Sequence, residues 1–346
     1  MSDLGLGGRF AAQVVHWQSQ HGRNDLPWQN TRDPYRVWLS EIMLQQTQVV
    51  TVRGYFKQFL DRFPDVQSLA LGSLDEVLGL WSGLGYYTRA RNLHKCAQTV
   101  MELHGGVFPQ SAQVLVTLPG IGRSTAAAIS SLCFGERVAI LDANVKRVLT
   151  RVLGFEADLA LAVHGRALWD AATDLLPLDQ ADMPRYTQGM MDLGATVCSP
   201  KKPLCDTCPV QKMCAASAAG DPQRFPVRTR RLKRSSQSIW MLWVQTDLGA
   251  VWLSKRPTPG VWAGLYCLPL FDSEEALRAA VPAQWHIRIQ PDVVFTHVLT
   301  HKDLHLHPLQ LVLPDQSIEW PDGQWVGAEE WPALGLPAPI RKLLQR

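Results

Sequence analysis

The sequence predicts a two-domain protein in which an all-α domain precedes an α+β domain. Three observations lead to this prediction: a length of 346 residues, repeated helical patterns in the first two thirds, and strand-like alternation in the last third. At roughly 150 residues per domain, such a chain divides into about two domains. Hydrophobic residues make up 46% of the chain and charged residues 19%. These fractions are typical of folded globular proteins and exclude wholesale disorder.

The first domain is predicted to be helical because apolar residues recur at helical spacing between short Gly/Pro breaks. Asp33 as N-cap and Pro34 at the first helical position mark a helix start, followed by an expected helix over residues 35–52. No segment before residue 223 shows sustained strand alternation. Further helices are expected at residues 67–80, 88–104, 111–117, 123–134, 144–153, 163–176 and 184–195.

The second domain is predicted to mix strands and helices. A turn at Asp247-Leu248-Gly249 separates two apolar runs and is typical of a hairpin. Strands are expected at residues 239–244, 251–253, 293–299 and 304–313, and helices at 273–281 and 339–345. The predicted organisation is therefore a helical domain over residues 1–223, a linker at 224–236 and an α+β domain over residues 237–346.

The formal net charge of +3 is unevenly distributed. Residues 1–223 carry 20 basic and 20 acidic residues, and residues 235–346 carry 8 and 11. The segment between them is interpreted either as a solvated linker or as a tether that crosses a phosphate backbone. Attraction to phosphate is also expected at Lys146-Arg147 and Lys201-Lys202. The basic residues of this segment are Arg224, Arg228, Arg230, Arg231, Lys233 and Arg234.

The sequence predicts neither membrane insertion nor export. No apolar run approaches the ~18 residues that a membrane-spanning helix needs. The first residues, Met1 to Gly5, lack the basic and apolar regions of a signal peptide. A cytoplasmic location with reduced thiols is therefore expected.

Four of the seven cysteines are crowded together, with the spacing Cys-x6-Cys-x2-Cys-x5-Cys. Four thiolates at this density in a reducing compartment suit a tetrahedral metal site. Zinc ribbons usually contain two Cys-x2-Cys pairs, and only one is present here. The spacing alone leaves zinc and iron–sulfur open. The four residues are Cys198, Cys205, Cys208 and Cys214.

A glycine-containing turn precedes one of the expected helices. Residues 118–126 read Leu-Pro-Gly-Ile-Gly-Arg-Ser-Thr-Ala, with glycines at positions 120 and 122. Such a turn exposes backbone amides beside a helix N-terminus, where a phosphate binds readily. An ordinary connection between two helices is the equal alternative. The Lys-Ser/Thr ending of a P-loop is missing, which disfavours nucleotide hydrolysis.

Two carboxylates are candidates for acid–base chemistry. Glu41 lies among apolar residues such as Trp38 and Ile42, and burial is favoured over a place at the solvent edge of the helix. Desolvation would raise its pKa and keep it protonated, as a general acid requires. Asp142 precedes a helix start and suits an N-cap. Capping and catalysis are compatible roles for this carboxylate.

Together these motifs resemble the helix-hairpin-helix superfamily of base-excision DNA glycosylases, and within it the MutY family of adenine glycosylases. The similarity extends through nearly the whole chain, and its motifs are long. The residues that carry it are 26–28 (LPW), 37–47 (VWLSEIMLQQT), 81–87 (WSGLGYY), 118–126, 140–145 (ILDANV), 190–194 (MMDLG), the four cysteines, 260–266 (GVWAGLY) and 295–297 (FTH).

The resemblance implies a glycoside hydrolysis that uses two carboxylates. Glu41 would protonate adenine at N7, and Asp142 would stabilise the sugar cation with support from Asn144. Gln188 would contact the adenine, which must be flipped out of the helix. The resemblance also implies a [4Fe–4S] cluster on Cys198, Cys205, Cys208 and Cys214.

The resemblance further implies a DNA interface and a domain that recognises the opposite base. Gly120, Gly122 and Ser124 belong to the hairpin, and related enzymes that also cut the strand carry a lysine at the position of Ser124. The chain is therefore expected to lack lyase activity. The second domain is expected to be Nudix-like, without the acidic box that pyrophosphate hydrolysis needs. Residues near the lesion would be Gln45, Gln46, Thr47 and Tyr86, and 8-oxoguanine would be recognised by Phe295, Thr296 and His297.

The sequence-based hypothesis is a monomeric, monofunctional glycosylase that removes adenine opposite 8-oxoguanine or guanine from duplex DNA. Three alternatives remain, of which a scaffold stabilised by zinc on the four cysteines is distinguished by iron and sulfide analysis. Another is a bifunctional pyrimidine-damage glycosylase–lyase, which Ser124 disfavours. The third is a non-catalytic damage-sensing DNA-binding protein, which the pair Glu41 and Asp142 disfavours.

Overall fold

The computed structural model describes residues 6–229, 233–316 and 320–346. Contacts divide the chain into two compact units, and each combines segments that are distant in sequence. The first unit comprises Met1–Lys57, Asp65–Gln67 and Lys95–Arg231, and the second comprises Gln58–Pro64, Ser68–His94 and Leu232–Arg346. The linker expected at residues 224–236 lies partly outside the described residues, because 230–232 are not described.

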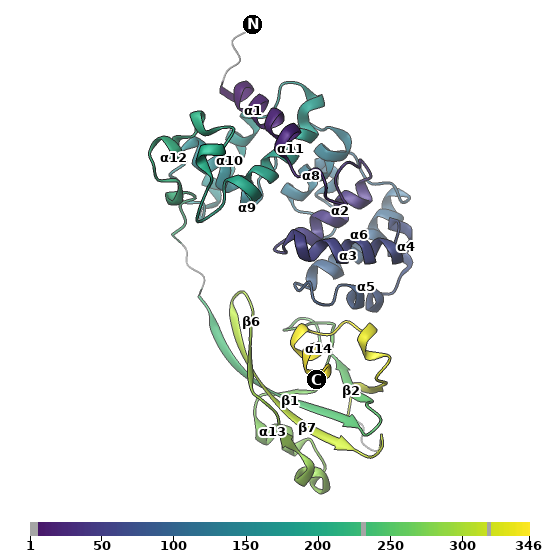
Figure 1. Cartoon of the computed structure of the whole chain (residues 1–346). Coiled ribbons are helices and arrows are strands. Elements are labelled where there is room, and N and C mark those ends of the chain that lie inside the picture. Colours follow the sequence, from purple (N-terminus) through teal and green to yellow (C-terminus); the bar gives the residue numbers. More distant parts are fainter. Residues whose placement is uncertain (1–5, 230–232, 317–319) are drawn as a thin grey trace. The chain divides into compact units, whose positions relative to one another are not determined.

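All regular structure described before residue 229 is helical (Figure 1), which confirms the predicted all-α region. Most expected helices are present within a few residues of their predicted bounds, whereas α1, α12 and most of α3 were not predicted. The helices are α1 (Leu6–His21), α2 (Pro34–Leu44), α3 (Val49–Arg62), α4 (Val66–Leu71), α5 (Leu74–Leu80), α6 (Thr88–His104), α7 (Ala112–Leu115), α8 (Arg123–Phe134), α9 (Ala143–Leu153), α10 (Ala162–Asp174), α11 (Met183–Asp192), the π-helix η2 (Leu193–Val197) and α12 (Ala215–Ala218).

Two of the helix predictions are wrong in their extent. The helix expected over residues 35–52 is interrupted, because Gln45 leaves the helical region with ψ 112° and Gln46 has φ 57°. The interrupting residues are polar and add nothing to a buried face. The helix expected over residues 67–80 is divided at Ser73, whose side chain forms a capping box with Glu76 at the start of α5.

The core of the first unit is built by α1, α8, α9, α10 and α11. Phe10 and Val14 of α1 are fully buried, and the ring of Phe10 meets that of Tyr186 edge to face at 6.3 Å between centroids. Val148 of α9 and Met190 of α11 join the same core. Helix α2 packs on α8, and α8 also packs on α11. This packing fixes the helices that carry the candidate catalytic residues.

The second unit contains a mixed sheet of eight strands with the central order β3-β2-β1-β7-β5. Strands β1 and β7 run parallel from the pair Ser235–Lys302 to the pair Thr246–Leu313, and the other pairings are antiparallel. The expected strands and the hairpin between β1 and β2 are confirmed. The strands are β1 (Ser235–Thr246), β2 (Val251–Lys255), β3 (Tyr266–Cys267), β4 (Leu270–Phe271), β5 (Gln290–Pro291), β6 (Phe295–Val298), β7 (Lys302–Leu313) and β8 (Gly323–Val326).

Each face of the sheet packs against one of the two predicted helices. Alternate residues of β1 point to opposite faces, as strand geometry requires. Met241 lies in the core that includes α14 (Ala338–Leu344), whereas Leu242 lies in the core that includes α13 (Glu274–Ala279). The sheet is therefore covered by helices on both faces.

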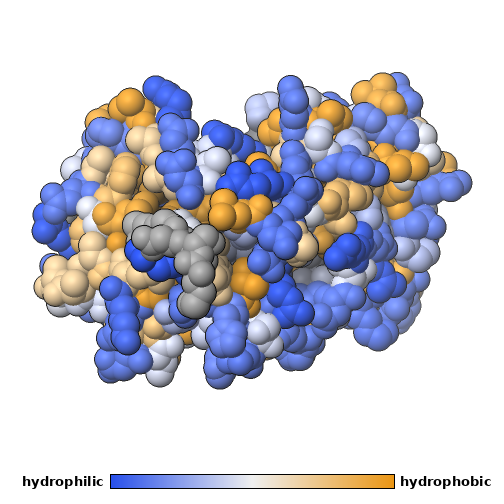
Figure 2. All heavy atoms as spheres, turned by 90° about the horizontal axis from the view of Figure 1, so that it is seen from above, coloured by the Kyte–Doolittle hydropathy of each residue, from blue (hydrophilic) through white to orange (hydrophobic). Residues whose placement is uncertain are grey.

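Apolar side chains are concentrated in these cores. On the face drawn in Figure 2, hydrophilic residues predominate and hydrophobic residues form separate patches. Within residues 6–229, 233–316 and 320–346, no helix combines the length and apolar character needed to cross a membrane.

Candidate functional site

Helix α2 carries Glu41. The helix begins where predicted, because the side chain of Asp33 accepts a hydrogen bond from the backbone N–H of Tyr35 at 2.9 Å and Pro34 follows the cap. Trp38 and Met43 are fully buried, and Glu41 keeps only a partly exposed surface among them. Burial raises the pKa of Glu41 from 4.5 to about 7, and the charge of Asp142 adds to this shift.

Asp142 lies at the start of α9, and its charge acts on Glu41. Its Oδ1 accepts a hydrogen bond from the backbone N–H of Val145 at 2.7 Å, so that it is the N-cap of the helix. Burial raises its pKa, while backbone hydrogen bonds from Val145 and Asn144 and the charge of Arg147 oppose this change. The site therefore pairs a carboxyl that holds its proton near neutrality with one whose anion receives backbone hydrogen bonds at a helix start.

Arg147 connects Asn144 to the cysteine loop. Its Nη2 donates to Oδ1 of Asn144 at 2.9 Å and to the carbonyl of Gly194 at 2.7 Å. Its Nε donates to the carbonyl of Cys198 at 2.8 Å. Arg147 was expected at a phosphate, but it is only 8% exposed and its guanidinium lies inside the protein. This expectation is wrong, because the residue occupies the inner face of an amphipathic helix whereas Lys146 does not.

All four clustered cysteines line one small cavity, and none forms a disulfide. Arg151 of α9 is 2% exposed and donates to the carbonyls of Ser199 at 2.8 Å and Pro200 at 2.9 Å. It also donates to Sγ of Cys198 at 3.3 Å, which places a buried cation beside the sulfurs. A thiol donor set with an adjacent cation fits a group held by thiolates.

A single zinc ion and a [4Fe–4S] cluster place their cysteine sulfurs differently. In the described part of the chain, no three His, Cys, Asp or Glu side chains are arranged to hold a single metal ion. A single zinc would bring its four sulfurs to within about 3.8 Å of one another. In a [4Fe–4S] cluster each cysteine binds a different iron, so the sulfurs stand farther apart. The structure places all four thiols around one cavity.

The hairpin predicted at residues 118–126 links α7 to α8. Gly120 has φ 77°, a conformation that favours glycine. Gly122 is the N-cap of α8. Because glycine has no side chain, no side-chain oxygen of the cap residue accepts a hydrogen bond from the first backbone amides of the helix. Oγ of Ser124 accepts a hydrogen bond from the backbone N–H of Leu141 at 3.1 Å. Ser124 therefore connects the hairpin to the segment that leads into Asp142.

The residues predicted near the lesion lie in two irregular segments. Gln45, Gln46 and Thr47 form the connection between α2 and α3 in the first unit. Tyr86 belongs to the second unit, has φ 49° and is 45% exposed. Its OH is hydrogen-bonded to Oγ1 of Thr300 at 2.7 Å within that unit. An exposed tyrosine held this way is available for contact with DNA.

Thr300 belongs to the turn between β6 and β7, residues 299–301. Phe295, Thr296 and His297 lie in strand β6, where Oγ1 of Thr296 is hydrogen-bonded to Nδ1 of His305 at 3.1 Å. Thr300 is therefore the threonine that is hydrogen-bonded to Tyr86, whereas Thr296 is hydrogen-bonded to His305. Sequence reasoning missed this turn, although its Thr-His pair repeats that of Thr296 and His297 four residues later.

A basic residue of the linker holds the same turn. Arg234 donates through Nη1 to the carbonyl of Thr300 at 2.8 Å and forms an ion pair with Asp303. The backbone N–H of Ser235 donates to the carbonyl of His301 at 3.0 Å. The turn is therefore anchored from the end of the linker, a role for Arg234 that charge counting did not predict.

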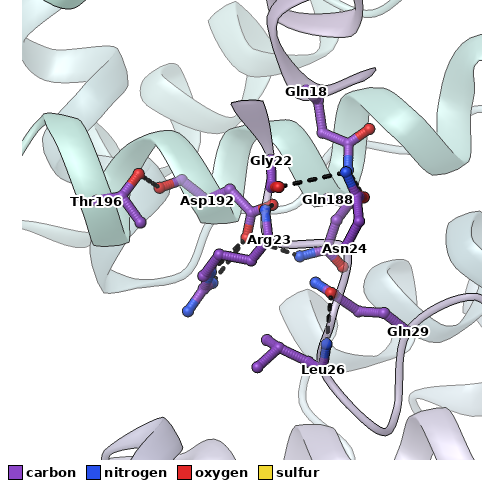
Figure 3. A network of polar contacts seen from close by, with 9 residues as sticks. All are labelled: Gln18, Gly22, Arg23, Asn24, Leu26, Gln29, Gln188, Asp192 and Thr196. Atoms are coloured by element: carbon purple, nitrogen blue, oxygen red, sulfur yellow. Dashed lines mark hydrogen bonds and ion pairs between the residues drawn. The ribbon is translucent and has the colours of Figure 1, made fainter. Parts of the chain in front are cut away.

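Gln188 of α11 lines a cleft of about 560 Å³ together with Trp28 and Gln29. Its Nε2 donates to Oδ1 of Asp192 at 3.0 Å, and Asp192 is completely buried. Arg23 binds the same carboxylate through Nε and Nη2, both at 2.8 Å, and through its backbone N–H at 3.0 Å (Figure 3). Burial raises the pKa of Asp192, and the charge of Arg23 opposes that shift. Neither Arg23 nor Asp192 was a candidate from the sequence.

Family models match both parts of the chain. Residues 39–164 match the HhH-GPD superfamily of base excision DNA repair proteins, and residues 239–346 match the NUDIX domain. These matches confirm the helix-hairpin-helix and Nudix-like folds that the resemblance predicted.

The chain is also similar to individual proteins. An adenine DNA glycosylase of Buchnera aphidicola subsp. Acyrthosiphon pisum is 37% identical, covering 97% of each chain. The human adenine DNA glycosylase is 33% identical, covering 97% of this chain and 73% of its own. Among solved structures, a thermostable thymine-DNA glycosylase matches with 28% identity and a TM-score of 0.56, covering 63% of this chain and 100% of its own. A non-covalent endonuclease III–DNA complex shares the fold, with 20% identity, a TM-score of 0.50, and 61% and 94% coverage. The chain therefore belongs to the adenine DNA glycosylase family, within the helix-hairpin-helix superfamily of base-excision repair enzymes.

Proposed function

We propose that this protein is a monofunctional glycosylase that hydrolyses the N-glycosidic bond of adenine opposite 8-oxoguanine, or opposite guanine, in duplex DNA. The pairing of Glu41 and Asp142 carries the proposal. The two carboxyls interact electrostatically, and Glu41 has a pKa of about 7, far above that of an ordinary glutamate. Glycoside hydrolysis needs one protonated carboxyl as the acid and one ionised carboxyl that stabilises the sugar cation.

Each residue has one role in the proposed reaction. Glu41 donates its proton to N7 of the flipped adenine, which makes the base a better leaving group. Asp142 remains ionised and stabilises the positive charge that develops on the sugar, and a water molecule then completes the hydrolysis. Asn144, held by Arg147 at 2.9 Å, supports the sugar and the water. Gln188 contacts the adenine in the cleft that it lines.

The remaining predicted residues form the proposed DNA and cofactor sites. The hairpin glycines Gly120 and Gly122 bind a phosphate through backbone amides, and Ser124 supports that hairpin. The opposite base is recognised by Tyr86 with Gln45, Gln46 and Thr47. It is also recognised by strand β6 and the turn that follows it, which contain Phe295, Thr296, His297 and Thr300. Cys198, Cys205, Cys208 and Cys214 hold a [4Fe–4S] cluster, which would fix the loop they belong to.

The decisive experiment is release of adenine from a duplex that contains one adenine opposite 8-oxoguanine, measured in a single turnover with excess enzyme. We expect complete release by the unaltered protein and loss of at least about 10³-fold in rate for Glu41→Gln, because the amide cannot donate a comparable proton. A duplex with adenine opposite thymine is the control substrate. An inert unaltered protein, or a fully active Glu41→Gln variant, would refute the proposal.

The alternatives make different predictions. A bifunctional enzyme needs an amine to form a Schiff base, and Ser124 offers a hydroxyl that is already bonded to the backbone N–H of Leu141. Borohydride should therefore trap no covalent protein–DNA adduct. A non-catalytic sensor would bind the mispair tightly without releasing any base. Iron and sulfide analysis of the purified protein tests the cluster, since zinc alone would contradict it.

A further inference from the structure

The amide of Gln188 has a fixed orientation because its neighbour can only accept hydrogen bonds. An ionised carboxylate has no proton to donate, so the side of the amide that faces Asp192 must be its nitrogen. The 3.0 Å contact joins Nε2 of Gln188 to Oδ1 of Asp192. The carbonyl oxygen Oε1 is then the group on the side of the amide that faces away from Asp192. Among the described residues, no donor is hydrogen-bonded to that oxygen.

Asp192 is held as a charged acceptor by Arg23. Two hydrogen bonds from Arg23 reach its carboxylate, one from Nε and one from the backbone N–H, and Nη2 forms an ion pair with it at 2.8 Å. The two residues are 169 positions apart in the sequence, so the contact joins the segment after α1 to the end of α11. The carboxylate is completely buried, whereas Gln188 is partly exposed and lines the cleft. Figure 3 shows the contacts among Arg23, Asp192 and Gln188. A fixed buried anion thus determines the polarity of a side chain that lines an accessible cleft.

We propose that Asp192 is a positioning residue that makes Gln188 present an acceptor oxygen to the cleft, and that this polarity selects purines with an amino group at C6. The inference rests on the proposed function, in which adenine occupies this cleft. The amino group of adenine donates hydrogen bonds and matches the acceptor. A purine with a carbonyl at C6 would place an acceptor against an acceptor, and a site built for one polarity rejects the other.

Two substrates and one variant test this polarity. Base release is measured in single turnovers, at saturating enzyme, for adenine and for unsubstituted purine, each opposite 8-oxoguanine. Purine lacks the C6 amino group, so its rate is insensitive to the acceptor. In Asp192→Asn the new amide at position 192 can donate a hydrogen bond as well as accept one. The side-chain amide of Gln188 can therefore rotate so that Nε2 and Oε1 exchange places. We expect the ratio of the adenine rate to the purine rate to fall about 10-fold, the effect of removing one hydrogen bond.

A third substrate measures the reversed polarity directly. Hypoxanthine has a carbonyl at C6, and the nitrogen of a reversed Gln188 amide can donate to it. For Asp192→Asn the ratio of the hypoxanthine rate to the purine rate should therefore rise, whereas a merely structural defect would lower all three rates together.

Two further variants separate positioning from folding. Thr196→Ala is the matched control, because Thr196 donates to the backbone carbonyl of Asp192 at 2.8 Å and does not contact the carboxylate. It should leave the adenine-to-purine ratio unchanged. Gln188→Leu keeps the ion pair between Arg23 and Asp192 and removes the amide. It should lower the same ratio, and adding Asp192→Asn to it should change the ratio no further.

The outcomes distinguish this inference from the proposed function. If the unaltered protein releases no adenine, the proposed function fails. If it releases adenine but Asp192→Asn and Gln188→Leu both retain the original adenine-to-purine ratio, the positioning role of Asp192 is wrong while the glycosylase assignment stands. If Asp192→Asn does not fold, an unchanged ratio in Gln188→Leu is sufficient to overturn the inference.

Discussion

At the scale of single residues, the proposed chemistry uses two carboxyls that differ in protonation. Glu41 has its pKa raised to about 7 mainly by burial. Asp142 also has a raised pKa, but hydrogen bonds from the start of α9 stabilise its anion. Burial raises the pKa of both groups, and hydrogen bonds at the start of α9 oppose that shift only at Asp142. In the proposed mechanism, the same side chain that begins the helix therefore also supplies the negative charge at the sugar.

This difference predicts how the reaction depends on pH. A carboxyl with a raised pKa holds its proton below that pKa and loses it as the pH rises. Single-turnover base release should therefore be high near about pH 6 and fall as the pH passes through about 7, because Glu41 loses the proton it must donate. At lower pH the rate should fall again as Asp142 becomes protonated. A rate that stays constant through neutrality would show that Glu41 is not the acid, and the slow reaction of Glu41→Gln should lack the fall on the alkaline side.

At the scale of elements, the hairpin before α8 offers a matched pair of glycines. Gly120 has φ 77°, which a residue with a side chain adopts only with strain. Gly122 has φ −83°, and a Cβ added there would meet no atom within 4 Å. A substitution at Gly120 therefore tests what the fold of the hairpin requires, and a substitution at Gly122 tests what DNA binding requires.

We expect Gly120→Ser to lower the free energy of unfolding by roughly 1–2 kcal/mol, because serine is strained in the left-handed region. Gly122→Ser should preserve stability, since serine is a favourable N-cap. It should nevertheless weaken duplex binding by about tenfold, because its side chain fills the space that a phosphate would occupy. Thermal unfolding and binding titrations measure the two effects. Normal binding by Gly122→Ser would mean that the phosphate does not approach this amide.

Helix α9 is the element that joins the catalytic segment to the cysteine loop. Its first turn contains Asn144, and its later turns contain Arg147 and Arg151, whose guanidinium groups hold backbone carbonyls of that loop. One helix therefore fixes two sites that are more than 50 residues apart in the sequence.

Replacing Arg151 with methionine should release the cysteine loop. The change leaves the carbonyls of Ser199 and Pro200 without their donor, which costs roughly 2–4 kcal/mol of stability. We expect a lower melting temperature and less iron and sulfide per chain. Lys212→Met is the matched control, because Lys212 is an exposed cation in the same loop. Equal iron content in the two variants would contradict a role for Arg151 in holding the loop.

At the scale of the whole molecule, the excess positive charge is concentrated in the linker, but part of it is already paired. Arg224 forms an ion pair with Glu156 at 2.8 Å, and Arg234 is engaged with Asp303 and the turn. Arg228 and Lys233 are exposed. Arg230 and Arg231 lie outside the described residues. These last four residues are the cations to test for contact with phosphate.

Neutralising these four residues by replacement with glutamine should reduce the dependence of DNA binding on salt. For every phosphate that the linker no longer neutralises, the slope of log K against log salt becomes shallower by about 0.9. Base release at saturating enzyme should remain unchanged, because the linker is not part of the catalytic pair. Arg278→Gln removes a cation that is paired with Glu274 and is the control. An unchanged salt slope in the fourfold variant would favour the interpretation of a solvated linker.

The sequence predicted features whose signals are local. The start of α9 follows from Asp142 as a cap, and the hairpin of β1 and β2 follows from its glycine turn. The break between α2 and α3 contains neither glycine nor proline, so no local signal reveals it. The choice between Thr296 and Thr300 depends on where β6 pairs with β7. The ion pair of Arg23 with Asp192 joins residues 169 positions apart and becomes visible only in the folded chain.

The double role of Asp142 has a consequence for the interpretation of genetic variants. Serine and asparagine are good N-caps, so Asp142→Ser or Asp142→Asn can retain the hydrogen bond to Val145 while removing the charge. Such variants should accumulate to normal levels and bind duplex DNA, yet release no adenine. Surveys that score variants by protein abundance would classify them as harmless, and only an assay of mutation rate or base release would identify them as defective.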